Sequence, residues 1–394
     1  GWNDVGFHGS NQIPTPNIDA LAYNGIILNS HYGQSFGTPS LTALLTGKYP
    51  MRLGMQGPSI TPAEERALPE GKIFPEYFKE MGYETHLVGK WHMGHSRWND
   101  TPTFRGFDHF FGYYNGFTSY YDYVSNWKIN GKDYSGFDLR RDTNPSWFDA
   151  GKYATDLFTE YATDVIQNHD INTSRVSTDL MHITDWLPTI FTGAGGDIGL
   201  LDPELDGIDQ WSSLVYDLPS ARNDILLNID EKTRNAALRF SYWKLIVGTS
   251  GNGTYNGYFG APLNENIDEQ PYNTTAINDS PVGRIAKRIS YNPLTDSDFE
   301  ILRRSATLKC LDAKGKKNYC DPASGAVCLY DIPNDPCEEN DLAKYFPSVV
   351  RRIKRTLVDY RKGLVPQIET TVDIENADPK LYRYTWNPWR DCAD

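Results

Sequence analysis

The sequence predicts an α/β fold in which a mostly parallel sheet is flanked by helices, followed by a smaller C-terminal α+β domain. The apolar run 26–28 indicates a strand, and a loop leads from it into a helix that begins at Thr38 and ends before Gly47. Farther along, a helix over 74–81 precedes a strand over 84–88. Such alternation of strand and helix is typical of a parallel sheet covered by helices.

A first helix is predicted just before these alternations. Thr15 is a suitable N-cap, Pro16 occupies the first helical position and Gly25 follows the end. We expect residues 1–227 to form the α/β domain and residues 228–394 the smaller domain. The elements expected in the smaller domain are strands over 240–247 and 326–331 and an amphipathic helix over 347–362.

Composition and charge restrict the classes of protein. With 394 residues, of which 39% are hydrophobic and 23% charged, the chain is long enough for two hydrophobic cores. A formal net charge of −13 disfavours nucleic acid or an anionic membrane as a partner, because both would be repelled. The basic run at 351–355 is flanked by apolar residues at helical spacing, as on a solvated helix face. No run of about 18 apolar residues is present, so we expect no membrane span.

All five cysteines lie in the last quarter of the chain. Short loops separate Cys310 from Cys320 and Cys328 from Cys337, so we expect two local disulfides there. Cys392 is left as a free thiol or as half of a disulfide whose partner is absent.

Five Asn-x-Ser/Thr sequons occur at Asn99, Asn172, Asn252, Asn273 and Asn278. Pro102 and Pro281 directly follow two of these sequons and are expected to weaken those acceptor sites. Sequons together with paired cysteines favour a secreted or lysosomal protein.

Aromatic side chains crowd residues 107–137. They include Phe110, Phe111, Tyr113, Tyr114, Phe117, Tyr120, Tyr121, Tyr123 and Trp127. Two interpretations stay open: the rings stack against a sugar, or they form a packed loop layer with tyrosine hydroxyls at the surface. The second is the more common role of such a cluster.

Several short sequence motifs are distributed along nearly the whole chain. They are 1–9, 14–22, Thr38-Pro39-Ser40 with 43–50, Gly89-Lys90-Trp91-His92-Met93-Gly94, Arg105-Gly106-Phe107-Asp108, 180–189, and 329–332 with 335–337. In this order they resemble the sulfatase family, in particular arylsulfatases of the B type. The resemblance implies an alkaline-phosphatase-like fold and hydrolysis of sulfate esters.

The resemblance also implies a particular chemistry. Family members attack sulfur with the hydrated aldehyde of a formylglycine, which is made from the cysteine of a Cys-x-Pro-Ser-Arg motif. A calcium ion held by aspartates and an asparagine offsets the negative charge of the sulfate, while Arg, Lys and His groups orient and protonate it.

This chain departs from the motif at its chemical positions. The motif reads Gly37-Thr38-Pro39-Ser40-Leu41, so glycine stands at the cysteine position and leucine at the arginine position. Lys90 and His92 are what remains of the implied catalytic set, and an equally good interpretation makes them ordinary polar residues at a strand end. The backbone N–H groups near Thr38 and Ser40 can still hold an anion such as sulfate.

Two segments that the resemblance implies have no counterpart here. The family's first metal-binding aspartates would precede Gly1, where we expect an upstream segment to have been removed, and Asp4 is no substitute. Near 170–176, family members carry a long segment with metal ligands, a histidine pair and a lysine. We therefore expect no metal site, calcium or formylglycine. Either the sheet repacks without its central strands, or the chain is not the whole native product. The family's partner for Cys392 would lie near 96–101, where no cysteine occurs.

These observations favour a non-catalytic sulfatase relative that binds sulfated glycans or small sulfate esters weakly. One alternative is a residual hydrolase, either a sulfatase or a phosphoesterase that uses Thr38 or Ser40 as nucleophile with two metal ions. Another is a truncated product of an active arylsulfatase, although Gly37 and Leu41 argue against it because they lie inside an intact block. The sequence indicates no oligomeric state.

Overall fold

The computed structural model describes residues 1–166, 175–249, 253–254, 271–290, 293–308, 318 and 320–391. The helices are α1 (Pro16–Tyr23), α2 (Gly37–Thr46), α3 (Phe74–Glu80), α4 (Ala154–Ile166), α5 (Trp186–Gly193), α6 (Trp211–Tyr216), α7 (Thr274–Asp279), α8 (Pro281–Ile289), α9 (Asp296–Ala306), α10 (Pro347–Arg361) and α11 (Ile374–Ala377). The strands are β1 (Ile26–Leu28), β2 (His31–Tyr32), β3 (His86–Lys90), β4 (His109–Tyr113), β5 (Val124–Ile129), β6 (Lys132–Phe137), β7 (Arg140–Arg141), β8 (Asn144–Pro145), β9 (Arg175–Ser177), β10 (Met181–His182), β11 (Asp224–Asp230), β12 (Asn235–Phe240), β13 (Trp243–Val247) and β14 (Val327–Asp331).

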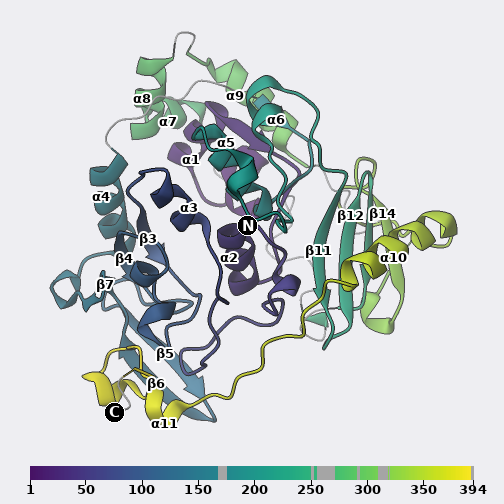
Figure 1. Ribbon diagram of the computed structural model, residues 1–394. Coiled ribbons are helices and arrows are strands. Elements are labelled where there is room, and N and C mark those ends of the chain that lie inside the picture. The colour runs from purple at the N-terminus through teal and green to yellow at the C-terminus, as the bar shows by residue number, and fades with distance from the viewer. Residues whose placement is uncertain are drawn as a thin grey trace.

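Parallel strand pairs surround the first helices. β1 pairs with β9, β2 with β10 and β3 with β4, each in parallel, and they belong to separate small sheets. Helix α2 lies near the centre of the molecule (Figure 1) and contacts α3 and α5. The parallel pairs and their helices confirm the predicted α/β class. The helices expected near 15–22, 38–45 and 74–81 are observed, and the strand expected over 84–88 is displaced to His86–Lys90.

An antiparallel sheet of order β11-β12-β13-β14 follows in the chain. Helix α10 crosses one face of this sheet (Figure 1), and its buried Ile353 and Leu357 pack with Leu238 and Leu245. The strand predicted over 240–247 is wrong as a single element, because β12 ends at Phe240 and a reversal intervenes before β13. Ser241 makes this reversal in the left-handed region, with φ 49°. The predicted division of the chain at 227/228 stays a prediction.

Later segments return to the first part of the molecule. Helices α7 and α8 pack against α1 around the buried Tyr23 and Ile277. The C-terminal segment runs back to β5 and β6 (Figure 1), where the Trp386 indole donates to the Ser125 carbonyl at 3.0 Å. Both ends of the chain therefore contribute to the first part of the fold.

A buried ion pair joins the α5 region to the antiparallel sheet. The side chains of Asp185 and Arg222 are 0% and 3% exposed, and the Arg222 Nε lies 2.8 Å from an Asp185 oxygen. Asp185 also accepts from the backbone N–H of Ile208 at 2.8 Å. Arg222 donates to the Tyr49 hydroxyl and the Asp224 carbonyl, each at 3.2 Å. The pair thus connects the α5 region to the first strand of the antiparallel sheet.

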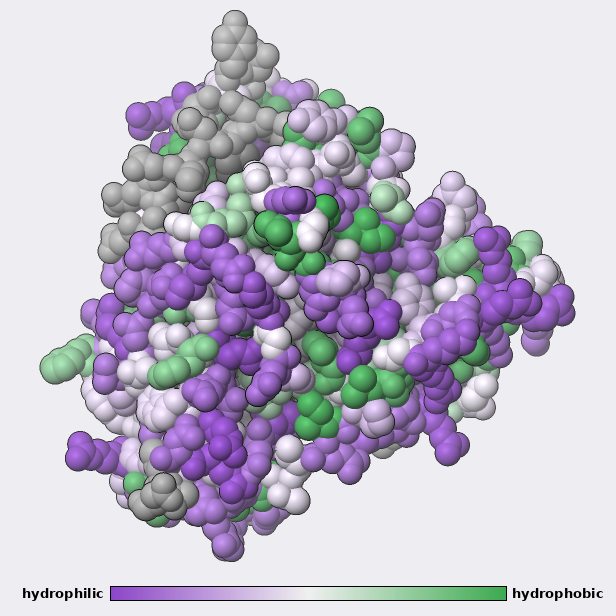
Figure 2. Space-filling view, in the orientation of Figure 1, coloured by the Kyte–Doolittle hydropathy of each residue, from purple (hydrophilic) through white to green (hydrophobic). Residues whose placement is uncertain are grey.

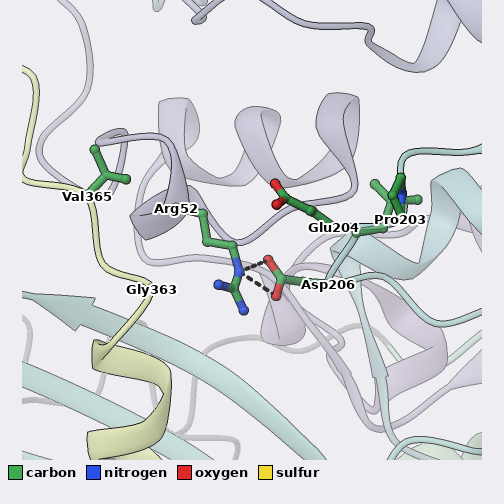
Figure 3. Close-up of a pocket in the computed structure, with 7 residues that line it drawn as sticks. Arg52, Pro203, Glu204, Asp206, Gly363 and Val365 are labelled. Atoms are coloured by element: carbon green, nitrogen blue, oxygen red, sulfur yellow. Dashed lines mark hydrogen bonds and ion pairs between the residues drawn. The ribbon is translucent and has the colours of Figure 1, made fainter.

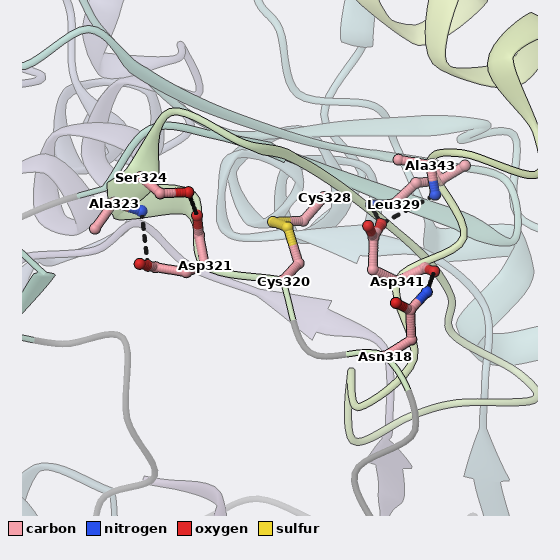
Figure 4. The surroundings of a disulfide bond; sticks show 9 residues. All are labelled: Asn318, Cys320, Asp321, Ala323, Ser324, Cys328, Leu329, Asp341 and Ala343. Carbon is pink, nitrogen blue, oxygen red and sulfur yellow. Dashed lines mark hydrogen bonds between the residues drawn. A yellow bond between two sulfur atoms is a disulfide. The ribbon is translucent and has the colours of Figure 1, made fainter.

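The disulfide pairing differs from the prediction. Cys320 is bonded to Cys328, with Cα atoms 5.8 Å apart (Figure 4), so the expected pairs Cys310–Cys320 and Cys328–Cys337 are wrong. Cys328 lies inside β14, which carries the chain away from it toward Cys337, whereas the turn at Pro322–Ser324 folds Cys320 back. Cys337 is also disulfide-bonded. Cys310 and Cys392 lie outside the described residues.

The surface is mostly polar. On the face shown in Figure 2, hydrophilic residues predominate and hydrophobic ones gather in small groups. Asn99 and Asn273 are exposed, whereas the Asn278 amide donates to Asp296 at 3.0 Å. The sequons at Asn172 and Asn252 lie outside the described residues. Within the described ranges, no helix combines the length and the apolar character that crossing a membrane requires.

Replacing Arg222 by alanine should strongly destabilise the fold. The Asp185 carboxylate would then stay buried without its cation, which typically costs about 3–5 kcal/mol. Urea denaturation of the wild type and the variant measures this change. Lys362→Ala, which removes an exposed partner of Asp359, is the matched control and should cost less than about 1 kcal/mol. Equal, small effects of both substitutions would contradict this role of Arg222.

Candidate functional site

The first residue of α2 faces the end of β3. Gly37 begins α2, Lys90 ends β3 and His92 follows two residues later. A Cβ atom built on Gly37 would lie 3.4 Å from His92 Nδ1 and 3.6 Å from Lys90 Nζ. Three residues singled out in the sequence therefore come together, and the glycine leaves open the space in front of the other two.

The His92 ring is fixed and buried. Its side chain is only 6% exposed, and Nε2 lies 3.0 Å from the Ile60 carbonyl oxygen. Because a carbonyl can only accept, Nε2 carries the hydrogen and Nδ1 presents a lone pair. Nδ1 has no hydrogen-bond partner within the described part of the chain. On the other side, a Cβ on Gly116 would lie 2.7 Å from His92 Cε1, so only glycine fits there.

The electrostatics of the site follow from burial. Burial, assisted by the neighbouring Lys90 charge, lowers the pKa of His92 to about 4, so the ring is neutral at neutral pH. Burial also lowers the pKa of Lys90. Among the residues that the structure describes, no carboxylate forms an ion pair with this lysine. Lys90 is therefore a half-buried cation without a counter-charge.

The hydroxyl groups of Thr38 and Ser40 are already engaged. Thr38 is fully buried; its Oγ1 donates to the His92 carbonyl and accepts from the Ile60 N–H, both at 3.2 Å. Ser40 Oγ donates to the Gln34 carbonyl at 3.1 Å and accepts from the Gln34 N–H at 3.0 Å. Both hydroxyls thus hold the local structure together and are poorly placed to act as nucleophiles.

The end of α2 offers a limited set of donors. Pro39 has no N–H, and the Ser40 N–H donates to the Phe36 carbonyl at 3.1 Å. The N–H groups of Gly37 and Thr38 are those that a helix leaves for an outside acceptor. Leu41 packs against the apolar cluster around Ile60 and Trp91, so the arginine position now belongs to the core.

Comparison with known proteins finds similarity to sulfatases. The family model described as Sulfatase matches residues 1–191. Residues 1–191, just under half of the 394 residues, thus match the sulfatase family. The chain is 26% identical to arylsulfatase J of Mus musculus over 519 aligned residues, which cover 99% of this chain and 78% of that protein. It is 34% identical to the N-acetylgalactosamine-6-sulfatase of Mus musculus, where the match covers 42% of this chain and about a third, 34%, of that protein.

Solved structures support the fold of this chain. Ps i-CgsB is 17% identical, with a TM-score of 0.63 over 97% of this chain and 94% of that one. A glycosaminoglycan-locus sulfatase of Bacteroides thetaiotaomicron reaches a TM-score of 0.55 at 15% identity, over 92% and 97%. At these identities the likeness concerns the fold alone, and the finer B-type assignment stays a prediction.

The residues of the site do not fit the family's formylglycine and calcium. Gly37 has no side chain that can be oxidised, and Leu41 supplies no charge. Within the described ranges, no group of three or more His, Cys, Asp or Glu side chains is placed to hold a metal ion. The segment near 167–174, where the sequence places one of the gaps, lies outside the described residues.

Several contacts of the candidate site are not predicted by the sequence. The Ile60 carbonyl binds the His92 ring, and Gly116 leaves room for that ring. No local sequence pattern signals either contact. Gln34 Nε2 lies 3.0 Å from Nε2 of His182, whose block 180–189 was noted only as a resemblance. Burial lowers the pKa of His182 well below its usual value, so this ring is also neutral.

A separate pocket of about 500 Å³ lies between the loop after α5 and the segment after α10 (Figure 3). Its lining residues are Arg52, Pro203, Glu204, Leu205, Asp206, Gly363 and Val365. The Arg52 Nε donates to both carboxylate oxygens of Asp206, at 2.7 and 2.8 Å. This contact satisfies the charge of Arg52 internally, and none of the site residues lines the pocket.

Stability should fall as the pH is lowered from about 6.5 towards 4. Over this range the unfolded chain binds a proton at His92 that the folded protein, with its pKa of about 4, does not bind. The resulting loss is at most about 1.4 kcal/mol of unfolding free energy per pH unit. Urea denaturation at a series of pH values measures it.

The His92→Gln variant should show a shallower pH dependence than the wild type. His109→Gln, which removes an exposed ring beside Glu84, is the matched control. If His92→Gln leaves the slope unchanged, the ring is not held neutral by burial.

Proposed function

We propose that this protein is a non-catalytic relative of the arylsulfatase B type, with a cleft at the start of α2 that binds a sulfate group. The observation that carries the proposal is the position of Gly37. Its α carbon faces Lys90 and His92, where the reacting aldehyde of an active sulfatase would stand. Without a nucleophile that acts as part of a unit, the rate falls by on the order of a million-fold.

The remaining groups suit binding better than catalysis. Lys90 supplies a positive charge, and the N–H groups of Gly37 and Thr38 point outward from the positive end of the helix dipole. The lone pair on His92 Nδ1 needs a hydrogen-bond donor, which a sugar hydroxyl provides and a sulfate dianion does not. A sulfated sugar therefore fits this set of groups better than inorganic sulfate alone.

Two further features support the proposal. One relative bears the name N-acetylgalactosamine-6-sulfatase, which favours a sulfated amino sugar as ligand class. The sequons and the Cys320–Cys328 disulfide favour a secreted or lysosomal location. A hydrolase that uses Thr38 or Ser40 is not favoured, because both hydroxyls are tied to the backbone.

The purified protein should not hydrolyse an aryl sulfate at any pH, with or without added calcium. The physical reason is the missing nucleophile at position 37. A fluorogenic aryl sulfate measures turnover, and an active sulfatase assayed in parallel validates the conditions.

Lys90→Met is the control for contamination in this assay. Activity from a contaminating sulfatase would persist unchanged in the variant, whereas activity of the protein itself would fall. Turnover that is abolished by a chelator and lowered by Lys90→Met would overturn the proposal.

Sulfate binding should depend on Lys90. A hydrogen bond to a charged group contributes about 1.5–3 kcal/mol, so Lys90→Met should weaken binding about tenfold or more. Isothermal titration with sodium sulfate at constant ionic strength measures the affinity. Gly37→Ala should weaken binding too, because its methyl group fits beside Lys90 but fills the space for the anion.

Lys128→Met removes an exposed lysine and is the matched control, which should bind sulfate like the wild type. Equal affinities of the wild type, Lys90→Met and Gly37→Ala would place the anion elsewhere.

A further inference from the structure

We propose that Tyr120, Tyr121 and Tyr153 form a platform on which a sugar ring of an oligosaccharide stacks, beside the cleft at the start of α2. The inference rests on the proposed function, because it supplies the second contact of the same ligand. The three residues are called the tyrosine platform below.

The rings of the platform are exposed and close together. Tyr120, Tyr121 and Tyr153 are 63%, 59% and 38% exposed. The Tyr153 ring centroid lies 5.7 Å from that of Tyr120 and 5.4 Å from that of Tyr121. Within the described part of the chain their hydroxyl groups form no hydrogen bonds. The planes of Tyr120 and Tyr121 are tilted by 43° and 37° from that of Tyr153, and the exposed parts of the rings and the hydroxyls are available to a ligand.

The backbone holds the platform in place. The Ala154 N–H donates to the Tyr120 carbonyl at 2.8 Å, and the Gly151 N–H donates to the Tyr121 carbonyl at 2.7 Å. These bonds fasten the loop that carries two of the tyrosines to the start of α4, which carries the third. Such preorganisation lowers the entropy that binding must overcome.

The chemistry of the platform matches a sugar. The face of an aromatic ring is negative, and it attracts the weakly positive C–H groups on one face of a pyranose. Tyrosine adds a hydroxyl that can pair with sugar hydroxyls, and it loses little conformational entropy on binding. A platform of three such side chains therefore suits a carbohydrate better than a purely apolar partner.

The platform follows closely in the chain on residues that contact Lys90 and His92. Tyr113 pairs with Lys90 in the β3–β4 register, and Gly116 lies against the His92 ring. Burial raises the pKa of Tyr113, with smaller contributions from Asp138 and from nearby Tyr120. From Gly116 to Tyr120 the chain spans at most about 14 Å. A short oligosaccharide can reach from the platform to the cleft.

The charges beside the platform cancel. Arg141 and Lys152 share the carboxylate of Asp149, at 3.1 and 3.0 Å, and exposed Asp122 supplies a second negative charge. The platform therefore contributes no net attraction for sulfate. Its contribution should be the same for sulfated and unsulfated sugars, whereas the contribution of Lys90 should need the sulfate.

The test uses an N-acetylgalactosamine-containing glycosaminoglycan hexasaccharide and its chemically desulfated form, titrated into the full chain by calorimetry. The double variant Tyr120→Ala/Tyr121→Ala should bind both probes about tenfold more weakly, because it removes two of the rings on which the sugar stacks. The double variant Tyr120→Phe/Tyr121→Phe keeps the rings and should lose less affinity. Tyr242→Ala/Tyr345→Ala removes two equally exposed tyrosines elsewhere and should bind like the wild type.

Lys90→Met separates the two proposals. It should weaken binding of the sulfated probe only. If the platform variant loses both probes while Lys90→Met loses neither, the platform stands and the sulfate cleft fails. If the platform variant binds both probes like the wild type, or if the wild type binds neither, the platform is overturned. Circular dichroism of each variant confirms that it is folded.

Discussion

The ion pair of Asp185 and Arg222 is the contact on which the placement of the antiparallel sheet against the α5 region depends. Both groups are almost fully removed from water, so each needs the other to offset the cost of burial. Arg222 also donates hydrogen bonds to the Tyr49 hydroxyl and to the carbonyls of Asp206 and Asp224. These partners come from the segment after α2, the loop after α5 and the start of β11. One guanidinium thereby ties the segment after α2 to the antiparallel sheet.

Local sequence signals predicted the helices, whereas the hairpin and the disulfide pairing depend on contacts between residues far apart in the chain. The helix near Thr15 and the helix that begins at Gly37 follow from capping residues, prolines and terminal glycines. The strand predicted over 240–247 was wrong because its apolar residues belong to both arms of a hairpin. The reversal is made by Ser241 at φ 49° and not by glycine, which most readily adopts a positive φ. The disulfide pairing failed because a short loop predicts easy closure but not the direction in which β14 carries Cys328.

The sequence predicted which residues form the candidate site, but not which groups they contact. The resemblance indicated Gly37, Lys90 and His92, and the structure brings these three residues together. What the sequence could not provide is that the Thr38 hydroxyl bridges two backbone groups, or that Leu41 has become part of the core. These contacts give the motif a role in folding. The remaining residues of the motif can therefore be present in a sequence for their role in folding alone.

Packing accounts for Thr38 and Leu41, but it does not account for Lys90 and His92. A half-buried ammonium without a carboxylate and a buried ring nitrogen without a donor both cost free energy in the described structure. An apolar side chain at either place would remove that cost. A ligand that offers an anionic oxygen to Lys90 and a hydroxyl to His92 Nδ1 would satisfy both groups at once. A sulfate-bearing sugar has the two functions on neighbouring atoms, and the open space at Gly37 is where such a ligand can approach both.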